Sequence, residues 1–163
     1  MKTSPCTDGA RVALFPGSFD PFTRGHESVV RRALPLFDRI VIAIGVNIDK
    51  PGFMPKAARQ QLIEGVFADE PRITVITYTG LTVDAARQCG AQFILRGVRS
   101  LQDFENEMHM ADVNRDLSGI ETVLLYSLPE HSHVSSTVVR ELAHFGHDIA
   151  PYLPANADLT LLP

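Results

Sequence analysis

Short apolar segments alternate along the chain with longer segments in which apolar side chains recur every three or four positions. The short segments are rich in Val, Ile and Leu and predict five β-strands, at residues 12–15, 39–46, 73–78, 92–95 and 122–126. The longer segments predict helices at residues 26–36, 55–67, 82–89, 101–117 and 135–145. Because strand and helix alternate throughout, the pattern predicts successive βαβ units.

Several of the predicted strands are apolar without strict alternation, which is typical of strands buried on both faces. We therefore expect a parallel sheet with helices on both faces, joined by right-handed crossovers into a doubly wound α/β sandwich. Ligands of such folds bind beyond the carboxyl ends of the strands, near the point where the strand order reverses. The loops that follow the strands are therefore the places to look for function.

Composition fits this picture. The chain has 163 residues, of which 45% are hydrophobic and 21% charged, which is enough to bury one core, so we expect a single domain over residues 10–163 and a flexible extension over residues 1–9. A net charge of −4 does not favour nucleic-acid binding. Cys6 and Cys89 form no metal-binding cluster, and no apolar segment is long enough to cross a membrane or act as an export signal. These features predict a cytoplasmic protein.

The loop after the first strand reads PGSFDPFTRGH and delivers His26 to the start of a helix. Amide groups at a helix N-terminus attract anions, and an imidazole there can donate a hydrogen bond to phosphate. The segment therefore suits a nucleotide, although it has neither the GK[ST] of a P-loop nor the GxGxxG of dinucleotide-binding proteins. A rigid turn with a capping histidine is the alternative interpretation.

Charged residues follow the fourth predicted strand. Arg96 is expected to end the strand and Arg99 to follow one short turn later, so both guanidinium groups can hold oxyanions in one crevice. Gly97 would let the backbone approach a ligand closely. Asp103 and Glu107 are four residues apart and share one face of the next helix, either as part of a binding site or as a solvated acidic face paired with Arg99.

Three hydroxyl side chains open the last predicted helix, and Arg140 follows one turn later. One hydroxyl would be enough to cap a helix. The unpaired N–H groups at such a helix start can receive a triphosphate. The three residues are Ser135, Ser136 and Thr137.

Together these motifs resemble the signatures of the HxGH nucleotidyltransferases, and in particular of the phosphopantetheine adenylyltransferase family. PGSFDPFTRGH is similar to the first signature, RGVR with DFENEM to the RGxR and DFExE block, and VSSTVVR to the ISSTxxR signature. The resemblance covers residues 12–153. It implies a Rossmann-like five-stranded sheet and transfer of the adenylyl group of ATP to 4′-phosphopantetheine, giving dephospho-CoA and pyrophosphate. It also implies Mg²⁺ as a helper, a homohexamer, and CoA as a feedback inhibitor.

The resemblance assigns roles to single residues. It implies that His26 stabilises the pentavalent α-phosphate, with Lys50 and Arg99 as further catalytic residues and Asp103 in support. The positions implied for phosphopantetheine are Ser18, Lys50, Thr82 and Arg96. Those implied for ATP are Ser18, Phe19, His26, Gly97, Val98, Arg99, Glu107, His131, Ser132, His133, Val134, Ser135, Ser136 and Thr137. No metal ligand is predicted, so we expect Mg²⁺ to arrive mainly with the triphosphate.

One segment departs from the family pattern. Relatives commonly carry Trp-Ser-Phe where this chain has His131, Ser132 and His133. Because an unperturbed histidine titrates at about pH 6.5, adenine packing is predicted to differ here and to depend on pH.

Other functions remain open at the level of sequence. Another small nucleotidyltransferase, such as a cytidylyltransferase or a mononucleotide adenylyltransferase, would share the first and last motifs, although the middle block weighs against it. A non-catalytic nucleotide-binding or CoA-binding regulator would keep the fold without turnover, but His26, Lys50 and Arg96 are all present. A response-regulator-like domain is disfavoured because basic residues, and not an acidic cluster, follow the strands.

Overall fold

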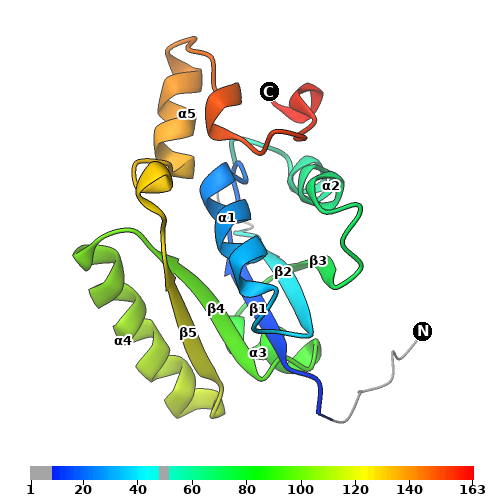
Figure 1. Cartoon of the computed structure of the whole chain (residues 1–163), viewed down its shortest axis with the longest axis vertical. Coiled ribbons are helices and arrows are strands. Elements are labelled where there is room, and N and C mark those ends of the chain that lie inside the picture. Colours follow the sequence, from blue (N-terminus) through cyan, green and yellow to red (C-terminus); the bar gives the residue numbers. More distant parts are fainter. Residues whose placement is uncertain (1–8, 48–51) are drawn as a thin grey trace.

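The computed structural model describes residues 9–47 and 52–163, whose strands form one parallel sheet in the order β3-β2-β1-β4-β5 (Figure 1). The strands are β1 (Val12–Gly17), β2 (Arg39–Gly45), β3 (Ile73–Tyr78), β4 (Phe93–Val98) and β5 (Glu121–Tyr126). The helices are α1 (Arg24–Ala33), α2 (Lys56–Val66), α3 (Thr82–Gln88), α4 (Leu101–Ser118) and α5 (Ser136–His144). Short 3-10 helices follow at η1 (Pro129–His131), η2 (Ala150–Tyr152) and η3 (Leu159–Leu161). The predicted parallel α/β sheet is confirmed, whereas Lys50 and the predicted extension, Gly9 apart, lie outside the described residues.

Helices cover both faces of the sheet, and the alternation of side chains along the strands separates the two layers of core. In β1, Ala13 and Phe15 pack in one cluster with the buried side of α1 and α2. Val12 and Leu14 point the other way, into a cluster with Val83 and the alanines of α3. Because successive strand residues face opposite sides, each central strand contributes to both cores.

Two strands extend further at their carboxyl ends than the sequence predicts. Strand β1 continues to Gly17 because it keeps its pairing with β2, and β4 continues to Val98 because it keeps its pairing with β5. The prediction that Arg96 ends its strand is therefore wrong: Arg96 lies inside β4, opposite Leu124. Pro, Gly and Arg have little intrinsic preference for strands, so the neighbouring strands decide these boundaries.

The strand order reverses between β1 and β4, and the pairing between these two strands is short. Ala13 and Leu14 lie opposite Phe93 and Ile94, and the register includes no later pair. Beyond this point the Arg96 guanidinium donates to the carbonyl of Pro16 across the gap. The two strands therefore open a crevice at the carboxyl edge of the sheet, where doubly wound folds bind ligands.

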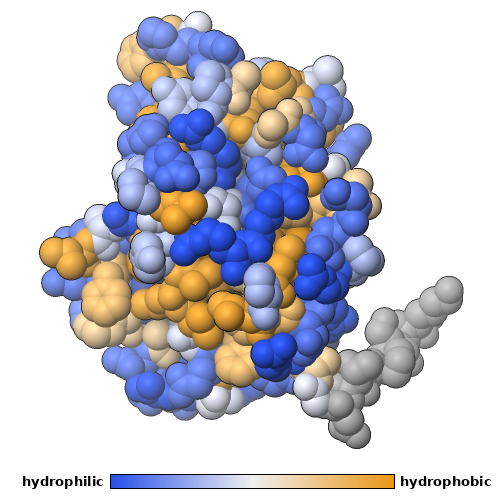
Figure 2. All heavy atoms as spheres, viewed as in Figure 1, coloured by the Kyte–Doolittle hydropathy of each residue, from blue (hydrophilic) through white to orange (hydrophobic). Residues whose placement is uncertain are grey.

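Helix α4 lies beside the edge strand β5, and none of its residues is fully buried (Figure 1). Its exposed side chains include large apolar ones, Leu101 at 84% exposure and Met110, Val113 and Leu117 at about half. Val123 and Leu125 of β5 are only half-buried, and Figure 2 shows a broad apolar area on the lower half of the face that carries α1. Several large exposed apolar side chains therefore gather on α4, beside the edge strand β5.

Candidate active site

A cavity of about 390 Å³ opens at the crevice between β1 and β4. Its walls come from the loop after β1, the start of α1, the end of β4, the first turns of α4 and the start of α5. Eleven residues that the sequence assigned to substrates line it: Ser18, Phe19, His26, Arg96, Gly97, Arg99, Glu107, Val134, Ser135, Ser136 and Thr137. The structure therefore brings together most of the predicted site from five separate segments.

His26 is held at the start of α1 by a reciprocal cap. The backbone N–H of Thr23 donates to Nδ1 of His26 at 3.0 Å, and the backbone N–H of His26 donates to the Thr23 hydroxyl at 3.4 Å. Because an N–H group can only donate, Nδ1 carries no proton, and the neutral ring carries its proton on Nε2. The capping interpretation of the motif is therefore correct, and Nε2 of His26 still has a donor N–H to offer.

Aromatic rings enclose His26, and cations lie near it. The Phe19 and Phe22 ring centroids are 5.1 and 5.3 Å from the imidazole centroid. Burial, and then the positive charges of Arg99 and Arg96, lower the pKa of His26 from 6.5 to about 3. His26 is therefore a neutral hydrogen-bond donor at pH 7.

This lowered pKa predicts a loss of stability in acid. The unfolded chain binds a proton at His26 near pH 6.5, whereas the folded chain does so only near pH 3. Between these values the unfolded state holds more protons, so the free energy of unfolding should fall by up to about 1.4 kcal/mol for each pH unit of acidification. We expect urea titrations from pH 7 to 4 to show a steeper loss for the wild type than for His26→Gln. Parallel profiles would contradict the assignment.

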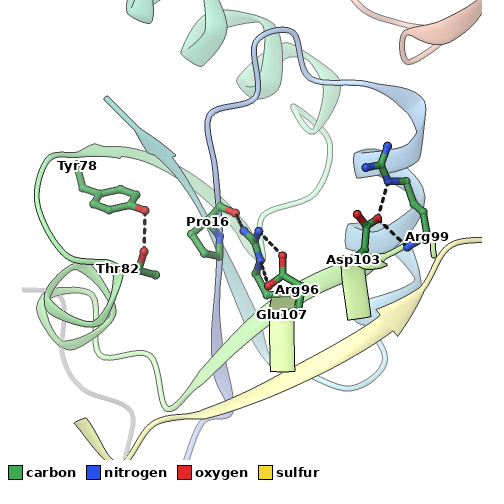
Figure 3. Close-up of polar contacts among 7 residues, drawn as sticks. All are labelled: Pro16, Tyr78, Thr82, Arg96, Arg99, Asp103 and Glu107. Carbon is green, nitrogen blue, oxygen red and sulfur yellow. Dashed lines mark hydrogen bonds and ion pairs between the residues drawn. The ribbon is translucent and has the colours of Figure 1, made fainter. Parts of the chain in front are cut away.

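Two of the three arginines that line the cavity, Arg96 and Arg99, each pair with a carboxylate of α4 (Figure 3). Glu107 accepts two hydrogen bonds from Arg96, at 2.8 Å from Nε and 2.6 Å from Nη2. One turn earlier in the helix, Asp103 accepts from Nε of Arg99 at 3.0 Å and from its backbone N–H at 3.1 Å. The alternative of an ion pair on this face is therefore correct for Asp103, but the partner of Glu107 is Arg96.

The loop after β1 is fixed by residues that sequence reasoning did not assign to the site. The buried carboxylate of Asp20 accepts from the backbone N–H groups of Phe53 and Met54, each at 2.7 Å. Arg59 donates to the carbonyl of Ser18 at 2.9 Å, and Arg140 donates to that of Asp20 at 2.7 Å. These bonds hold the loop against α2 and α5. The sequence around each of these donors and acceptors does not indicate which residue it pairs with.

The same contacts hold the backbone of Phe19 in an unusual conformation. Its φ of 47° lies in the left-handed region, which is uncommon for a residue with a side chain. The Phe19 ring packs against Phe15 and Phe22, with both centroid distances 5.3 Å. Such strain persists only where the surroundings enforce it, and it is frequent at functional sites.

The hydroxyl groups at the start of α5 have three different partners within the protein. Ser135 caps the helix by accepting from the N–H of Val138 at 3.2 Å. Ser136 donates to the carbonyl of Pro21 at 2.8 Å, and Thr137 accepts from Arg140 at 3.2 Å. The N-terminus of α5 is thereby attached to the loop that precedes α1 and His26.

Four predicted site residues that the structure describes line neither the main cavity nor a smaller cavity that adjoins it: Val98, His131, Ser132 and His133. Val98 is buried at the end of β4. His131 ends η1, and His133 packs edge-on against Tyr152, with ring centroids 6.4 Å apart. Their predicted contact with ATP, and its pH dependence, stay predictions.

Thr82 lines a second cavity of about 160 Å³ that adjoins the first. Its hydroxyl lies 3.0 Å from that of Tyr78 (Figure 3). Pro16, Arg96 and Glu107 line both cavities, and Met110 and Asn114 of α4 extend the second. The Arg96–Glu107 pair therefore stands at the boundary between the two spaces.

The described part of the chain contains no group of three or more His, Cys, Asp or Glu side chains that could hold a metal ion. The two carboxylates that line the main cavity, Asp103 and Glu107, are both paired with arginine. These residues therefore do not form a cage for a resident metal.

Within the described ranges, no helix has the length and apolarity to cross a bilayer.

Comparison with known proteins agrees with the fold. The family model described as cytidylyltransferase-like matches residues 14–142. A solved structure of a bifunctional NMN adenylyltransferase/ADP ribose pyrophosphatase from Francisella tularensis superposes with a TM-score of 0.71 at 15% identity, covering 90% of this chain and 46% of that one. The chain therefore has the fold of the nucleotidyltransferases.

Closer relatives define the family. The chain is 54% identical to the phosphopantetheine adenylyltransferase of Phocaeicola vulgatus, over 88% of this chain and 95% of that protein. It is 52% identical to that of Porphyromonas gingivalis, over 88% and 94%. The chain belongs to the phosphopantetheine adenylyltransferase family and is a nucleotidyltransferase.

Proposed function

We propose that this chain transfers the adenylyl group of ATP to 4′-phosphopantetheine, giving dephospho-CoA and pyrophosphate in coenzyme A biosynthesis. The observation that carries the proposal is the neutral His26, which offers an Nε2–H donor in a cavity shared with Arg96 and Arg99. The names of the relatives at 54% and 52% identity support the choice of acceptor.

The reaction is a direct displacement. An oxygen of the acceptor phosphate forms a bond to the α-phosphorus of ATP while the bond from that phosphorus to the pyrophosphate oxygen breaks. The attacking phosphate is already ionised near pH 7, so no side chain has to remove a proton. Catalysis then consists of alignment and stabilisation of charge, for which a neutral donor such as His26 is suited.

The residues divide between the two substrates. His26 donates to the α-phosphoryl oxygen that gains charge, while Arg99 and the N-terminus of α5 hold the triphosphate. Arg96 binds the acceptor phosphate, and Thr82 contacts the pantetheine arm in the second cavity. Lys50, which lies outside the described residues, bridges the reacting phosphates by analogy with the family. The other proposed ATP contacts are Ser18, Phe19, Gly97, Val98, Glu107, His131, Ser132, His133 and Val134.

We propose that Mg²⁺ enters as part of the substrate MgATP. Both carboxylates of the cavity are already paired with arginine. Mg²⁺ commonly keeps several waters and binds phosphate oxygens, so it does not require a cage of protein ligands.

We further propose a homohexamer in the cytoplasm, with CoA as a feedback inhibitor. The apolar side chains exposed on α4 support assembly, because contiguous apolar surface of this kind often marks a protein interface. CoA contains the same pantetheine arm and phosphates as the product, so it would compete for the same two cavities.

The substrate assignment is tested by measuring pyrophosphate release with ATP or CTP crossed with three acceptors: 4′-phosphopantetheine, glycerol phosphate and nicotinamide mononucleotide. We expect release with ATP and 4′-phosphopantetheine at a rate at least about a hundredfold above the other pairs, a difference of about 2.7 kcal/mol in transition-state binding. A higher rate with CTP or another acceptor would identify a different nucleotidyltransferase. ATP binding without release under any condition would indicate a regulator.

A further inference from the structure

We infer that Glu107 is a positioning residue that orients Arg96 for the acceptor phosphate, and that its contribution to the reaction passes through Arg96. This inference rests on the proposed function and deepens it. It gives Glu107 a role toward the acceptor in addition to the contact with ATP that the family resemblance implies. The evidence is the way in which the donors of Arg96 are distributed.

A guanidinium group has five N–H donors in a fixed plane. In Arg96, the Nε–H and one N–H of Nη2 go to Glu107. One N–H of Nη1 goes to the carbonyl of Pro16. The remaining donors are one on each of the two Nη atoms. Glu107 and Pro16 thus fix the plane of the group and leave this pair of donors for a ligand oxyanion.

The position of these two remaining donors makes the acceptor phosphate their most suitable ligand. Pro16, Arg96 and Glu107 line both cavities, and the second cavity extends toward Thr82. The phosphate of an acceptor whose arm lay in the second cavity would reach the main cavity at Arg96. Arg99, on the triphosphate side, has its own carboxylate in Asp103. Arg96 and Arg99 therefore pair with different carboxylates, which lie one turn apart on α4.

Burial distinguishes the pair from an ordinary surface ion pair. The side chains of Arg96 and Glu107 are 33% and 16% exposed, whereas those of Arg115 and Asp112 on the same helix are 51% and 57% exposed. The bidentate geometry fixes both partners, while exposed pairs contribute little. Asp112 consequently provides a matched control on α4 that lines neither cavity.

Removing the charge of Glu107 has two opposing effects. A carboxylate near the acceptor phosphate repels it, so neutralisation alone would strengthen acceptor binding. Loss of the bidentate contact frees the guanidinium to rotate, which weakens binding. If Glu107 acts by positioning, the second effect dominates, and the KM for the acceptor rises.

The test is a double-mutant cycle with Glu107→Gln, Arg96→Lys and the double variant, in steady-state assays that vary each substrate separately. We expect Glu107→Gln to raise the KM for 4′-phosphopantetheine about tenfold, equivalent to about 1.4 kcal/mol, and to change the KM for ATP less. Lysine has no planar guanidinium group for Glu107 to orient. In the Arg96→Lys background, Glu107→Gln should therefore raise the KM for 4′-phosphopantetheine by less than about twofold further. Asp112→Asn should match the wild type.

Two results would overturn the inference while leaving the proposed function intact. One is a fall, or no change, in the acceptor KM of Glu107→Gln. The other is full additivity of the two substitutions, which would mean that Glu107 acts independently of Arg96. A wild-type chain without turnover on this substrate pair would instead refute the proposed function and this inference with it. Melting temperatures of all variants identify any that fail to fold.

Discussion

Replacing His26 with alanine is expected to lower kcat for pyrophosphate release by at least about a hundredfold, a loss of about 2.7 kcal/mol of transition-state stabilisation. The substitution removes the neutral Nε2–H donor that the Thr23–His26 cap holds at the start of α1. A donor aimed at charge that develops in the transition state affects kcat more than ground-state binding. The KM values for both substrates should therefore change much less than kcat.

His147→Ala is the matched control for this experiment. His147 is exposed and lines neither cavity, so its loss should leave kcat unchanged. Because His26 also completes a helix cap, the folded fraction of each variant is measured by thermal melting before the assay. A folded His26→Ala variant that retains wild-type kcat would show that His26 only shapes the turn.

Replacing Asp20 with alanine is expected to lower the free energy of unfolding by about 3 kcal/mol. The buried carboxylate accepts from the N–H groups of Phe53 and Met54, and alanine leaves both donors without this acceptor. Hydrogen bonds to charged groups contribute more than neutral ones, and buried groups without a partner carry the full desolvation cost. Urea denaturation measures the difference.

Two further variants isolate the cause of this loss. Asp20→Asn keeps one oxygen acceptor at the same place and should lose less stability than Asp20→Ala. Asp116→Ala removes an exposed carboxylate from α4 and should change stability by no more than about 0.5 kcal/mol. Equal losses for Asp20→Ala and Asp116→Ala would mean that the two backbone contacts contribute nothing to stability.

The pattern of apolar residues was sufficient to predict the sheet and its covering helices. The predicted strand at 73–78 coincides with β3, and the predicted helix at 101–117 differs from α4 by one residue. The ends of β1 and β4 were missed because Pro16, Gly17, Arg96 and Gly97 do not favour strands by themselves. Their extended conformation depends on pairing with β2 and β5, which local sequence does not encode.

The candidate site was predictable where its residues follow strands or begin helices. His26 and Ser135 lie at helix starts, and the carboxyl edge of a parallel sheet brings such positions together. The pairing of Glu107 with Arg96 was not predictable, because it depends on how α4 packs along β4. Asp20 was missed for a similar reason, since its partners lie more than thirty residues away in the chain.

The formation of both products by the wild-type chain tests the proposed reaction most directly. The chain is incubated with MgATP and 4′-phosphopantetheine, and pyrophosphate and dephospho-CoA are quantified in the same samples, beside a sample without the acceptor. Direct attack predicts equal molar amounts of the two products and no pyrophosphate without the acceptor. Absence of dephospho-CoA from samples of the folded protein, or pyrophosphate release that does not depend on the acceptor, would contradict the account.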